Sequence, residues 1–139
     1  MSPAVVVDTN VVVAGLPLVG NPLPVARILK GMREAAFAFV VSEPLLAEYR
    51  EVLARPSLRK LHGLADEALA TVMARLEAGA DLVEAAASAA SAPDPGDQML
   101  WELLAARADA VLVTSDRLLL RDRAMRGRVL TPQAWLALS

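Results

Sequence analysis

Short runs of β-branched residues alternate along the chain with segments in which apolar residues recur at helical spacing. Val5–Val7 is wholly apolar, is too short for a helix and ends at Asp8, as expected of a strand that is buried on both faces. Strands that alternate with helices of about ten residues form βα units, so the chain is predicted to form a parallel sheet covered by helices. Further strands are predicted at residues 38–41, 110–114 and 128–131, with a weaker edge strand at 82–83.

The helices are predicted between these strands. Apolar residues at i, i+1, i+4, i+7 and i+8 predict a helix over residues 45–53. Ser42 and Pro44 supply its N-terminal cap and first-turn proline. Residues 85–92, rich in Ala and Ser, are predicted to be a connector. Other helices are predicted at residues 64–80, at 98–108 and from Thr131 and Pro132 onward.

Composition narrows the class of protein. A length of 139 residues without an internal repeat or linker predicts a single domain, residues 1–139. The absence of Cys excludes disulfide scaffolds, thiolate nucleophiles and zinc fingers. The N-terminus has no basic segment, and the longest uncharged stretch, residues 9–26, contains three Pro and two Gly. We therefore expect a cytoplasmic protein with no signal peptide and no membrane partner.

Charge is balanced overall and uneven locally. Sixteen acidic and fourteen basic residues give a net charge of -2, which excludes a protein that coats nucleic acid by charge alone. Residues 117–128 hold five Arg and one Asp, and Arg can pair with phosphate and stack on bases. Arg117 and Arg121 in this segment, with Arg50 and Arg55 earlier in the chain, are candidate RNA contacts. A solvated basic surface is the alternative.

Acidic residues follow the predicted strands. Asp8 comes directly after the first strand, Asp116 follows the strand 110–114, and Asp97 begins the helix before that strand. Ligands of parallel α/β sheets bind outside the carboxyl ends of the strands. Glu48 lies at the border of its helix's apolar face. We therefore predict that these four carboxylates meet at one edge of the sheet.

Four clustered carboxylates suggest a metal-dependent hydrolase. Like charges at close range resist joint ionisation, and a hard divalent cation removes that cost. Oxygen ligands favour one or two Mg²⁺ or Mn²⁺ ions, which support phosphodiester hydrolysis. Asn10, Thr114 and Ser115 are candidates to support the site. Each acid also has a simpler explanation, because Asp116 can cap a helix, Asp97 can be a first-turn acid and Glu48 a rim residue.

The same residues carry a resemblance to a known family. Together they resemble the PIN-domain family, and most of all its VapC-like branch, the toxin components of toxin–antitoxin systems. The last strand and helix, residues 129–136, also fit that family. The motifs are residues 5–11 (VVVDTNV), 41–53 (VSEPLLAEYREVL), 94–97 (DPGD) and 108–116 (ADAVLVTSD).

The resemblance implies a three-layer α/β/α fold with a parallel sheet of four to five strands in the order 3-2-1-4-5. It also implies that Mg²⁺ or Mn²⁺ is held by an acidic cluster. The implied substrate is RNA, either single-stranded, as is usual, or structured, and cleavage leaves 5′-phosphate and 3′-hydroxyl ends. The family's four acids correspond to Asp8, Glu48, Asp97 and Asp116. Where the toxin branch has a further acid, this chain has Gly96, so that either Asp94 takes part or a second metal site is weaker.

We therefore expect a Mg²⁺- or Mn²⁺-dependent ribonuclease, the toxin of a toxin–antitoxin pair, which binds an antitoxin protein and forms a homodimer. Residues 58–64 and the helix that follows are the candidate partner contacts, and His62 is expected to lie in a loop. The alternative is a weakly active or inactive PIN-fold module that binds RNA or protein. A receiver-like or phosphatase-like domain is disfavoured, because neither Lys30 nor Lys60 follows a late strand and Asn10 stands where a phosphatase needs an acid.

Overall fold

The valine run Val5–Val7 forms the central strand, β1, in the computed structural model, which describes residues 3–18 and 22–138. The ends of the predicted 1–139 domain, residues 1–2 and 139, lie outside the described residues. β1 pairs in parallel with β4 (Val111–Val113), and β4 pairs in parallel with β5 (Val129–Leu130). A second parallel pair is formed by β2 (Val40–Val41) and β3 (Asp81–Leu82).

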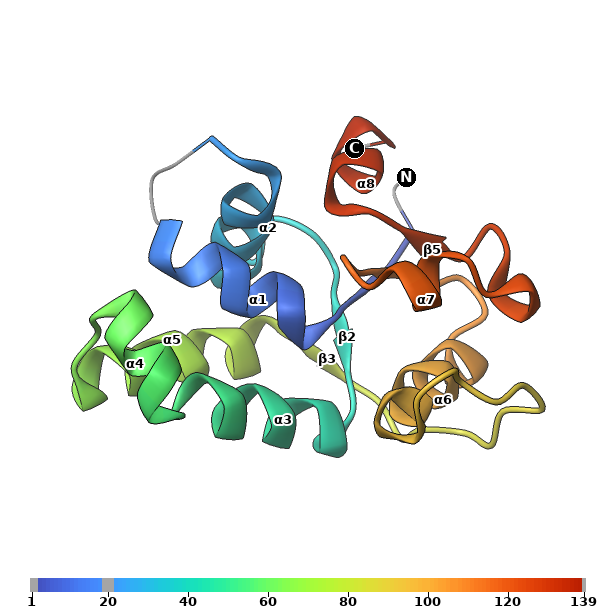
Figure 1. Ribbon diagram of the computed structural model, residues 1–139, viewed down its shortest axis with the longest axis horizontal. Coiled ribbons are helices and arrows are strands. Elements are labelled where there is room, and N and C mark those ends of the chain that lie inside the picture. The colour runs from blue at the N-terminus through green and yellow to red at the C-terminus, as the bar shows by residue number, and fades with distance from the viewer. Residues whose placement is uncertain (1–2, 19–21, 139) are drawn as a thin grey trace.

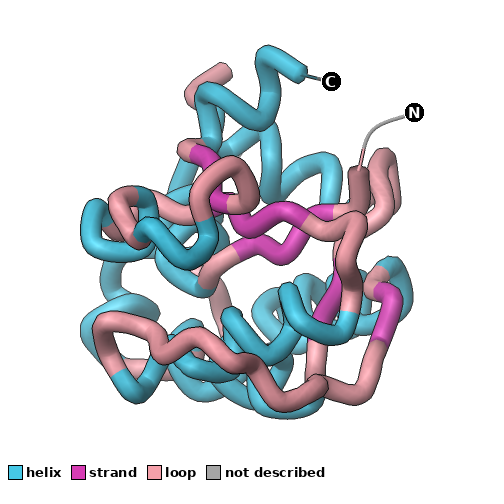
Figure 2. The backbone as a smooth tube through the Cα atoms, turned by 90° about the vertical axis from the view of Figure 1, so that its right-hand side faces the viewer, coloured by secondary structure: helices cyan, strands magenta, loops and turns pink. Residues whose placement is uncertain are grey.

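The two pairings are joined beside β1. Phe39, which precedes β2, forms a parallel bridge with Val5, and the Val5 N–H donates to the Ala38 carbonyl at 3.1 Å. The strands therefore run in the predicted order 3-2-1-4-5, although the hydrogen-bonded sheet is divided into three strands and two. The predicted α/β fold with a parallel sheet is confirmed. Figure 2 shows the strands in the middle of the molecule, with helices on either side.

Three strands are shorter than predicted. β4 and β5 end one residue early, before Thr114 and Thr131, whereas β2 ends at Val41 as predicted and begins two residues late. Ser42 directly follows β2 and accepts a hydrogen bond from the Leu45 N–H, so the chain passes at once from strand to helix. The Thr131 hydroxyl accepts from the Ala134 N–H in the same way after β5. The edge strand β3 lies one residue earlier than predicted, at Asp81–Leu82, and is exposed.

Helices of one to four turns surround the sheet (Figure 1). The predicted helix over 45–53 is confirmed as α3, which begins two residues earlier at Glu43. The predicted helix 98–108 ends at Ala106, because Arg107 adopts an extended conformation. The helices are α1 (Thr9–Gly15), α2 (Pro24–Arg33), α3 (Glu43–Leu53), α4 (Pro56–His62), α5 (Asp66–Gly79), α6 (Gln98–Ala106), α7 (Arg117–Leu120) and α8 (Pro132–Leu138), with 3-10 turns η1 (Leu16–Leu18), η2 (Pro95–Asp97) and η3 (Arg123–Met125).

Three helices, α1, α2 and α4, were not expected from the sequence. The prediction that His62 lies in a loop is wrong, because His62 ends α4. Its Nε2 lies 3.1 Å from the Leu53 carbonyl oxygen, and its Nδ1 accepts from the Leu64 N–H at 3.0 Å. Gly63 then ends the helix in the left-handed conformation at φ 66°, which costs Gly little. His62 thus holds the turn that joins α4 to the next helix.

One hydrophobic core fills the space around β1 and β4. All three residues of β1 are buried, and Trp101 of α6, Tyr49 of α3 and Phe39 are the largest wholly buried side chains. The core therefore lies directly beneath the carboxyl ends of β1 and β4, where the candidate carboxylates are. Within the described ranges, no helix is long and apolar enough to cross a membrane.

Tyr49 ties α3 to the end of β1. Its side chain is wholly buried, and its hydroxyl donates to the Val7 carbonyl at the last residue of the strand. Glu48 is the preceding residue on the helix, so this bond also sets where Glu48 lies relative to Asp8. Loss of a donor to a buried carbonyl costs more than loss of an exposed hydrogen bond.

We predict that Tyr49→Phe lowers the free energy of unfolding by about 1–2 kcal/mol, because the buried Val7 carbonyl loses its donor. Urea denaturation in the presence of EDTA measures this change. Thr71→Val is the matched control, since it removes an exposed hydroxyl that donates to the Glu67 carbonyl, and it is expected to change stability by less than about 0.5 kcal/mol. Equal stability of Tyr49→Phe and the parent would contradict the prediction.

Candidate functional site

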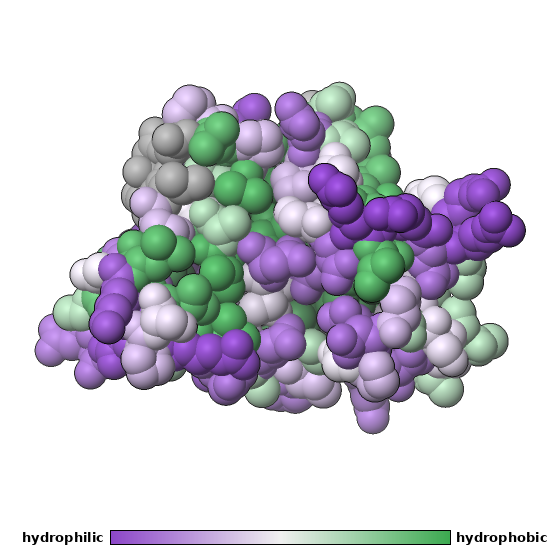
Figure 3. Space-filling view, in the orientation of Figure 1, coloured by the Kyte–Doolittle hydropathy of each residue, from purple (hydrophilic) through white to green (hydrophobic). Residues whose placement is uncertain are grey.

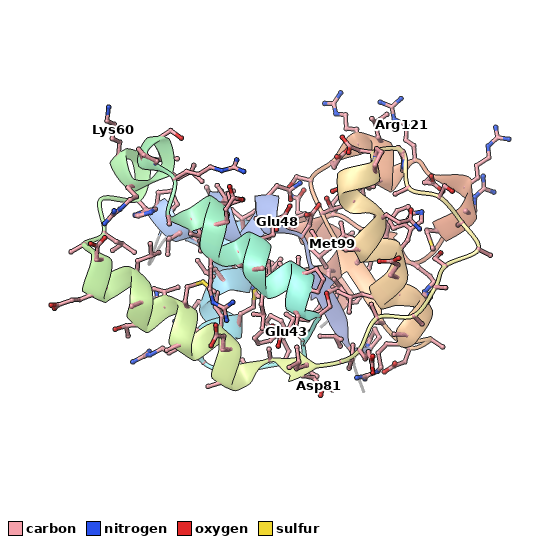
Figure 4. All side chains as sticks on the ribbon, turned by 90° about the horizontal axis from the view of Figure 1, so that it is seen from below. Glu43, Glu48, Lys60, Asp81, Met99 and Arg121 are labelled. Atoms are coloured by element: carbon pink, nitrogen blue, oxygen red, sulfur yellow. The ribbon has the colours of Figure 1, made fainter. Side chains whose placement is uncertain are left out.

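The four carboxylates predicted to meet line one open cleft of about 410 Å³ at the carboxyl ends of β1 and β4. Asp8 follows β1, Glu48 lies on α3, Asp97 ends η2 and Asp116 precedes α7. Figure 4 shows Glu48 on the same side of the molecule as Arg121, with Glu43 of the same helix on the other side. Thr9, Asn10, Val13 and Arg55 line the same cleft.

Asp8 is the most buried of the four carboxylates. Only 6% of it is exposed, and the Asp8 N–H donates to the Val113 carbonyl, which fixes its backbone against β4. The Thr114 hydroxyl donates to Asp8 Oδ2 at 2.7 Å, and the Asn10 amide donates to the same oxygen at 3.3 Å. Asp8 precedes α1 without capping it through its side chain. Its carboxylate is thus held in one orientation by these hydrogen bonds but does not cap the helix.

Asp116 caps a helix in addition to lining the cleft. Its Oδ1 accepts from the Leu118 N–H at 2.8 Å and so caps α7, as the simpler explanation of this residue proposed. Its own N–H donates to Thr114 Oγ1 at 3.0 Å. Thr114 is wholly buried and therefore connects the carboxylates that follow β1 and β4.

Burial and neighbouring negative charges raise the pKa values of two carboxylates in the cleft. Burial raises the pKa of Asp8, and the charges of Glu48 and Asp116 raise it further, while the Thr114 hydrogen bond lowers it. Burial also raises the pKa of Asp97 to about 6, with further increases from Asp8 and Asp116, then Asp94 and Glu48. In the described part of the chain, no ion pair includes any of the four cleft carboxylates. The carboxylates are therefore close enough to disfavour one another's ionisation.

Thr9 is a site residue that the sequence did not indicate. Its hydroxyl donates to Glu48 Oε2, although the two residues are 39 positions apart. Thr9 is buried and comes directly after Asp8, which is the only local signal that could have suggested it. This bond holds the Glu48 carboxylate toward the cleft rather than toward solvent.

The carboxylates share a cleft without forming a ready set of ligands. Among residues 3–18 and 22–138, no group of three His, Asp or Glu side chains is placed so that it could hold a metal ion. The donors are nevertheless all oxygen atoms, the type that Mg²⁺ and Mn²⁺ prefer. Mg²⁺ commonly binds one or two carboxylates and keeps several waters, so a hydrated ion needs fewer direct ligands than the four carboxylates of this cleft.

The other residues that were predicted to support the site lie in different places. Asn10 Oδ1 lies 3.4 Å from the Ser115 N–H, so Ser115 contributes its backbone to the site. Asp94 does not line the cleft, because its Oδ1 accepts from the Gly96 N–H at 2.8 Å and caps η2. A Cβ at Gly96 would lie 3.2 Å from that carboxylate oxygen. The small residue thus leaves room for the Asp94 cap.

The four Arg residues predicted to contact RNA lie in different surroundings. Arg55 lines the cleft and pairs with Glu51 at 3.0 Å, one helical turn away. Arg50 pairs with Glu77 of α5 and lines a separate groove. Arg117 and Arg121 are exposed on and just after α7. Only Arg55 of the four lies in the cleft wall.

One of the five Arg in the basic segment is structural. The Arg128 guanidinium donates to the carbonyls of Leu104, Arg107 and Ala110 at 2.7 to 3.2 Å, which joins the end of α6 to β5. The interpretation of all five as one solvated basic face is therefore wrong in this respect. Four Arg of the segment are exposed: Arg117, Arg121, Arg123 and Arg126.

We predict that Asp97→Asn changes the pH dependence of stability. The pKa of Asp97 in the folded protein, about 6, lies above its ordinary value of 3.8, so protonation of Asp97 favours the folded state. That contribution is complete below 3.8 and is lost as the pH rises through about 6. In EDTA, Asp97→Asn is expected to become more stable than the parent as the pH rises from about 4 to about 7.5, as measured by urea denaturation.

Asp109→Asn is the control for this measurement. The hydrogen bond from Arg107 lowers the pKa of Asp109, so its stabilising contribution is present above the ordinary pKa and is lost only below it. Asp109→Asn should therefore be less stable than the parent by a constant amount from about pH 5 to about pH 7.5. A difference between Asp97→Asn and the parent that stays constant with pH would refute the coupling of Asp97 to the cleft.

Comparison with known families agrees with this geometry. The family model of the PIN domain matches residues 4–118, a range that contains Asp8, Glu48, Asp97 and Asp116. We found no curated protein that matches the chain.

Proposed function

Because the chain belongs to the PIN-domain family, whose fold is of the nuclease type, we propose that it is a metal-dependent endoribonuclease acting on single-stranded RNA. The observation that carries the proposal is the cleft in which Asp8, Glu48, Asp97 and Asp116 meet. No ion pair among the described residues compensates their charge. A site that concentrates uncompensated carboxylates suits a reaction that needs a divalent cation.

The residues fit Mg²⁺ or Mn²⁺ by the chemistry of their donors. Asp8, Asp97 and Asp116, with help from Glu48, would hold one or two ions. Burial first, and then the charges of the neighbouring carboxylates, raise the pKa values of Asp8 and Asp97, and a cation would favour their ionised forms. When bound, the cation lowers the pKa of a water and stabilises charge on phosphate oxygens.

The neighbouring polar residues orient these carboxylates. Thr114 and Asn10 donate to the same Asp8 oxygen, and a backbone hydrogen bond at Thr9 also favours the ionised Asp8 carboxylate. Thr9 holds Glu48 on the cleft side of α3. Asn10 is exposed at the cleft, where its amide can also orient a water toward the phosphorus. Such partners keep ligand geometry fixed and typically contribute 10–100-fold to metal affinity or activity.

We propose that RNA crosses the cleft between Arg55 on one wall and Arg117 and Arg121 beside Asp116. The net charge of -2 does not prevent this, because four exposed Arg are concentrated on α7 and the segment after it. Figure 3 shows strongly hydrophilic side chains over this part of the molecule, on the right of the view. Local pairing of Arg with phosphates is sufficient to hold a short single strand.

We further propose that the protein is the toxin of a toxin–antitoxin pair, neutralised by an antitoxin protein, and that it forms a homodimer. Apolar surface on α4 supports a protein partner, since Leu61 is 62% exposed and Leu58 is partly exposed beside it. Exposed apolar patches mark interaction sites. Light scattering at micromolar concentration tests the homodimer, and a monomer would count against it.

We predict that Asp8→Asn and Asp97→Asn each reduce Mn²⁺-dependent cleavage of a mixed RNA pool by at least about 100-fold, more than the loss of an outer partner costs. Product ends are mapped with Mn²⁺ and with EDTA, and 5′-phosphate and 3′-hydroxyl ends are expected only with Mn²⁺. Glu43→Gln is the control and should keep the parental activity, because Glu43 lies on α3 and does not line the cleft. Parental activity in Asp8→Asn and Asp97→Asn would refute the proposal.

The separation of the four carboxylates gives the alternative a specific basis. Since no three of them are placed to hold an ion in the described residues, a PIN-fold module that binds RNA or protein without catalysis is the second candidate. The two candidates differ in their response to metal, because an ion that binds only the folded protein stabilises it.

We predict that Mn²⁺ at about 100 times its dissociation constant adds roughly 2.7 kcal/mol to the free energy of unfolding of the parent protein. Thermal unfolding with and without Mn²⁺ measures this effect. Asp8→Asn should lose most of it, and Glu43→Gln should keep it. If Mn²⁺ leaves the parent's unfolding midpoint unchanged, the binding module is the correct account.

A further inference from the structure

A second cavity, of about 260 Å³, lies between the end of α1, α2 and α5, and it shares no lining residue with the acidic cleft. These three helices are neighbours at the left of Figure 1. Gly15, Ala26 and Leu29 form an apolar floor, and all three are buried. A Cβ at Gly15 would lie 2.5 Å from the Val25 carbonyl oxygen, so α1 packs directly on α2 and closes one end of the cavity.

The rim of this cavity is cationic. Lys30 and Arg33 come from α2 and Arg75 from α5, and among the residues that the structure describes Glu34 is the one acid that lines the cavity. Three positive charges and one negative charge give +2. Ala26, Lys30 and Arg33 recur at the spacing of one helical face, which explains why the floor and the rim run along the same side of α2. No ion pair in the described ranges includes Lys30, Arg33 or Arg75.

Arg33 carries an unsatisfied donor. Its Nε is buried and has no hydrogen-bond acceptor among the described residues, and a buried donor without an acceptor is destabilising. Because a water molecule does not reach this Nε, Arg33 lines the cavity through its other atoms. Its position near the end of α2 favours its positive charge. Arg128 shows the contrast, because its partly buried guanidinium donates to three backbone carbonyls.

We propose that this cavity binds a small phosphate monoester that carries a short apolar group. A phosphate monoester has a charge of about -1.5 to -2 at pH 7, which matches the +2 of the rim. Its oxygens are acceptors for the guanidinium groups of Arg33 and Arg75, which both line the cavity, and Arg groups bind phosphate through paired N–H donors. The apolar substituent lies on the floor made by Ala26 and Leu29.

Volume limits the size of the ligand. A cavity of about 260 Å³ is smaller than the roughly 300–1,000 Å³ that is typical of sites for drug-sized ligands. A phosphate with a short chain therefore matches this cavity better than a nucleotide does. The proposal is therefore separate from the RNA-binding surface and does not depend on the nuclease activity.

Thermal unfolding in EDTA with propyl phosphate, inorganic phosphate and 1-propanol tests this site. For a dissociation constant near 1 mM, 5 mM propyl phosphate is expected to raise the unfolding midpoint by about 3–4 °C. Inorganic phosphate should give a smaller rise because it leaves the apolar floor uncovered, and 1-propanol should give none because it lacks the charge. No shift with propyl phosphate would overturn the proposal.

Substitutions of the residues that line the cavity test whether propyl phosphate binds there. Arg33→Gln and Arg75→Gln should each weaken binding of propyl phosphate about tenfold or more, measured by calorimetry. Arg75 is exposed, so this variant carries the test if Arg33→Gln does not fold. Glu34→Gln should bind more tightly, because it removes the negative charge from the rim. Arg27→Gln is the matched control on α2, since Arg27 does not line the cavity, and it should bind as the parent does.

Two results would contradict this placement. Equal loss of affinity in Arg27→Gln and Arg75→Gln would mean a general effect of positive charge. Loss of affinity in Arg121→Gln with none in Arg75→Gln would assign the phosphate to the basic segment near α7 instead.

Discussion

Repulsion among four carboxylates at the end of a buried parallel pair of strands is the constraint on which the site depends. β1 and β4 are in register from Val5 with Val111 to Val7 with Val113, so the residues that follow them, Asp8 and Thr114, are brought side by side. Burial and like charge then raise the pKa of Asp8 and of Asp97. Such an arrangement is retained at a cost in stability, as is typical of functional sites.

Contacts in and beside the cleft hold these carboxylates in place. Tyr49 anchors α3 to the Val7 carbonyl, and Thr9 directs Glu48 toward the cleft. Thr114, wholly buried, donates to Asp8 and accepts from the Asp116 backbone. These contacts place the carboxylates but leave their charge uncompensated, so the balanced net charge of the chain conceals a local negative site. The exposed Arg of residues 117–126 begin directly after Asp116, and together the two features suit a metal-assisted grip on RNA.

The strand-end acids were predictable because a parallel sheet has a simple rule. A run of three valines that stops at an Asp places that Asp at the carboxyl edge, whatever the rest of the chain does. Helix α1 escaped prediction because residues 9–15 carry no charge, so that the polar side of a helical pattern is missing. Helix α2 does have that pattern, with Ile28, Leu29 and Met32 buried and Arg27 and Lys30 exposed, but it was not recognised from the sequence. The bonds from Thr9 to Glu48 and from Arg128 to the end of α6 join residues distant in sequence. Tertiary packing alone determines them.

The central claim is that these carboxylates form one electrostatic unit that a divalent cation completes. Titration of the Asp97 carboxyl by ¹³C NMR, with and without Mg²⁺, measures it most directly. The account predicts a pKa of about 6 for Asp97 without the ion and a clear decrease when Mg²⁺ is present, because the cation favours the ionised form. An Asp97 pKa near 3.8 that Mg²⁺ does not change would contradict the account.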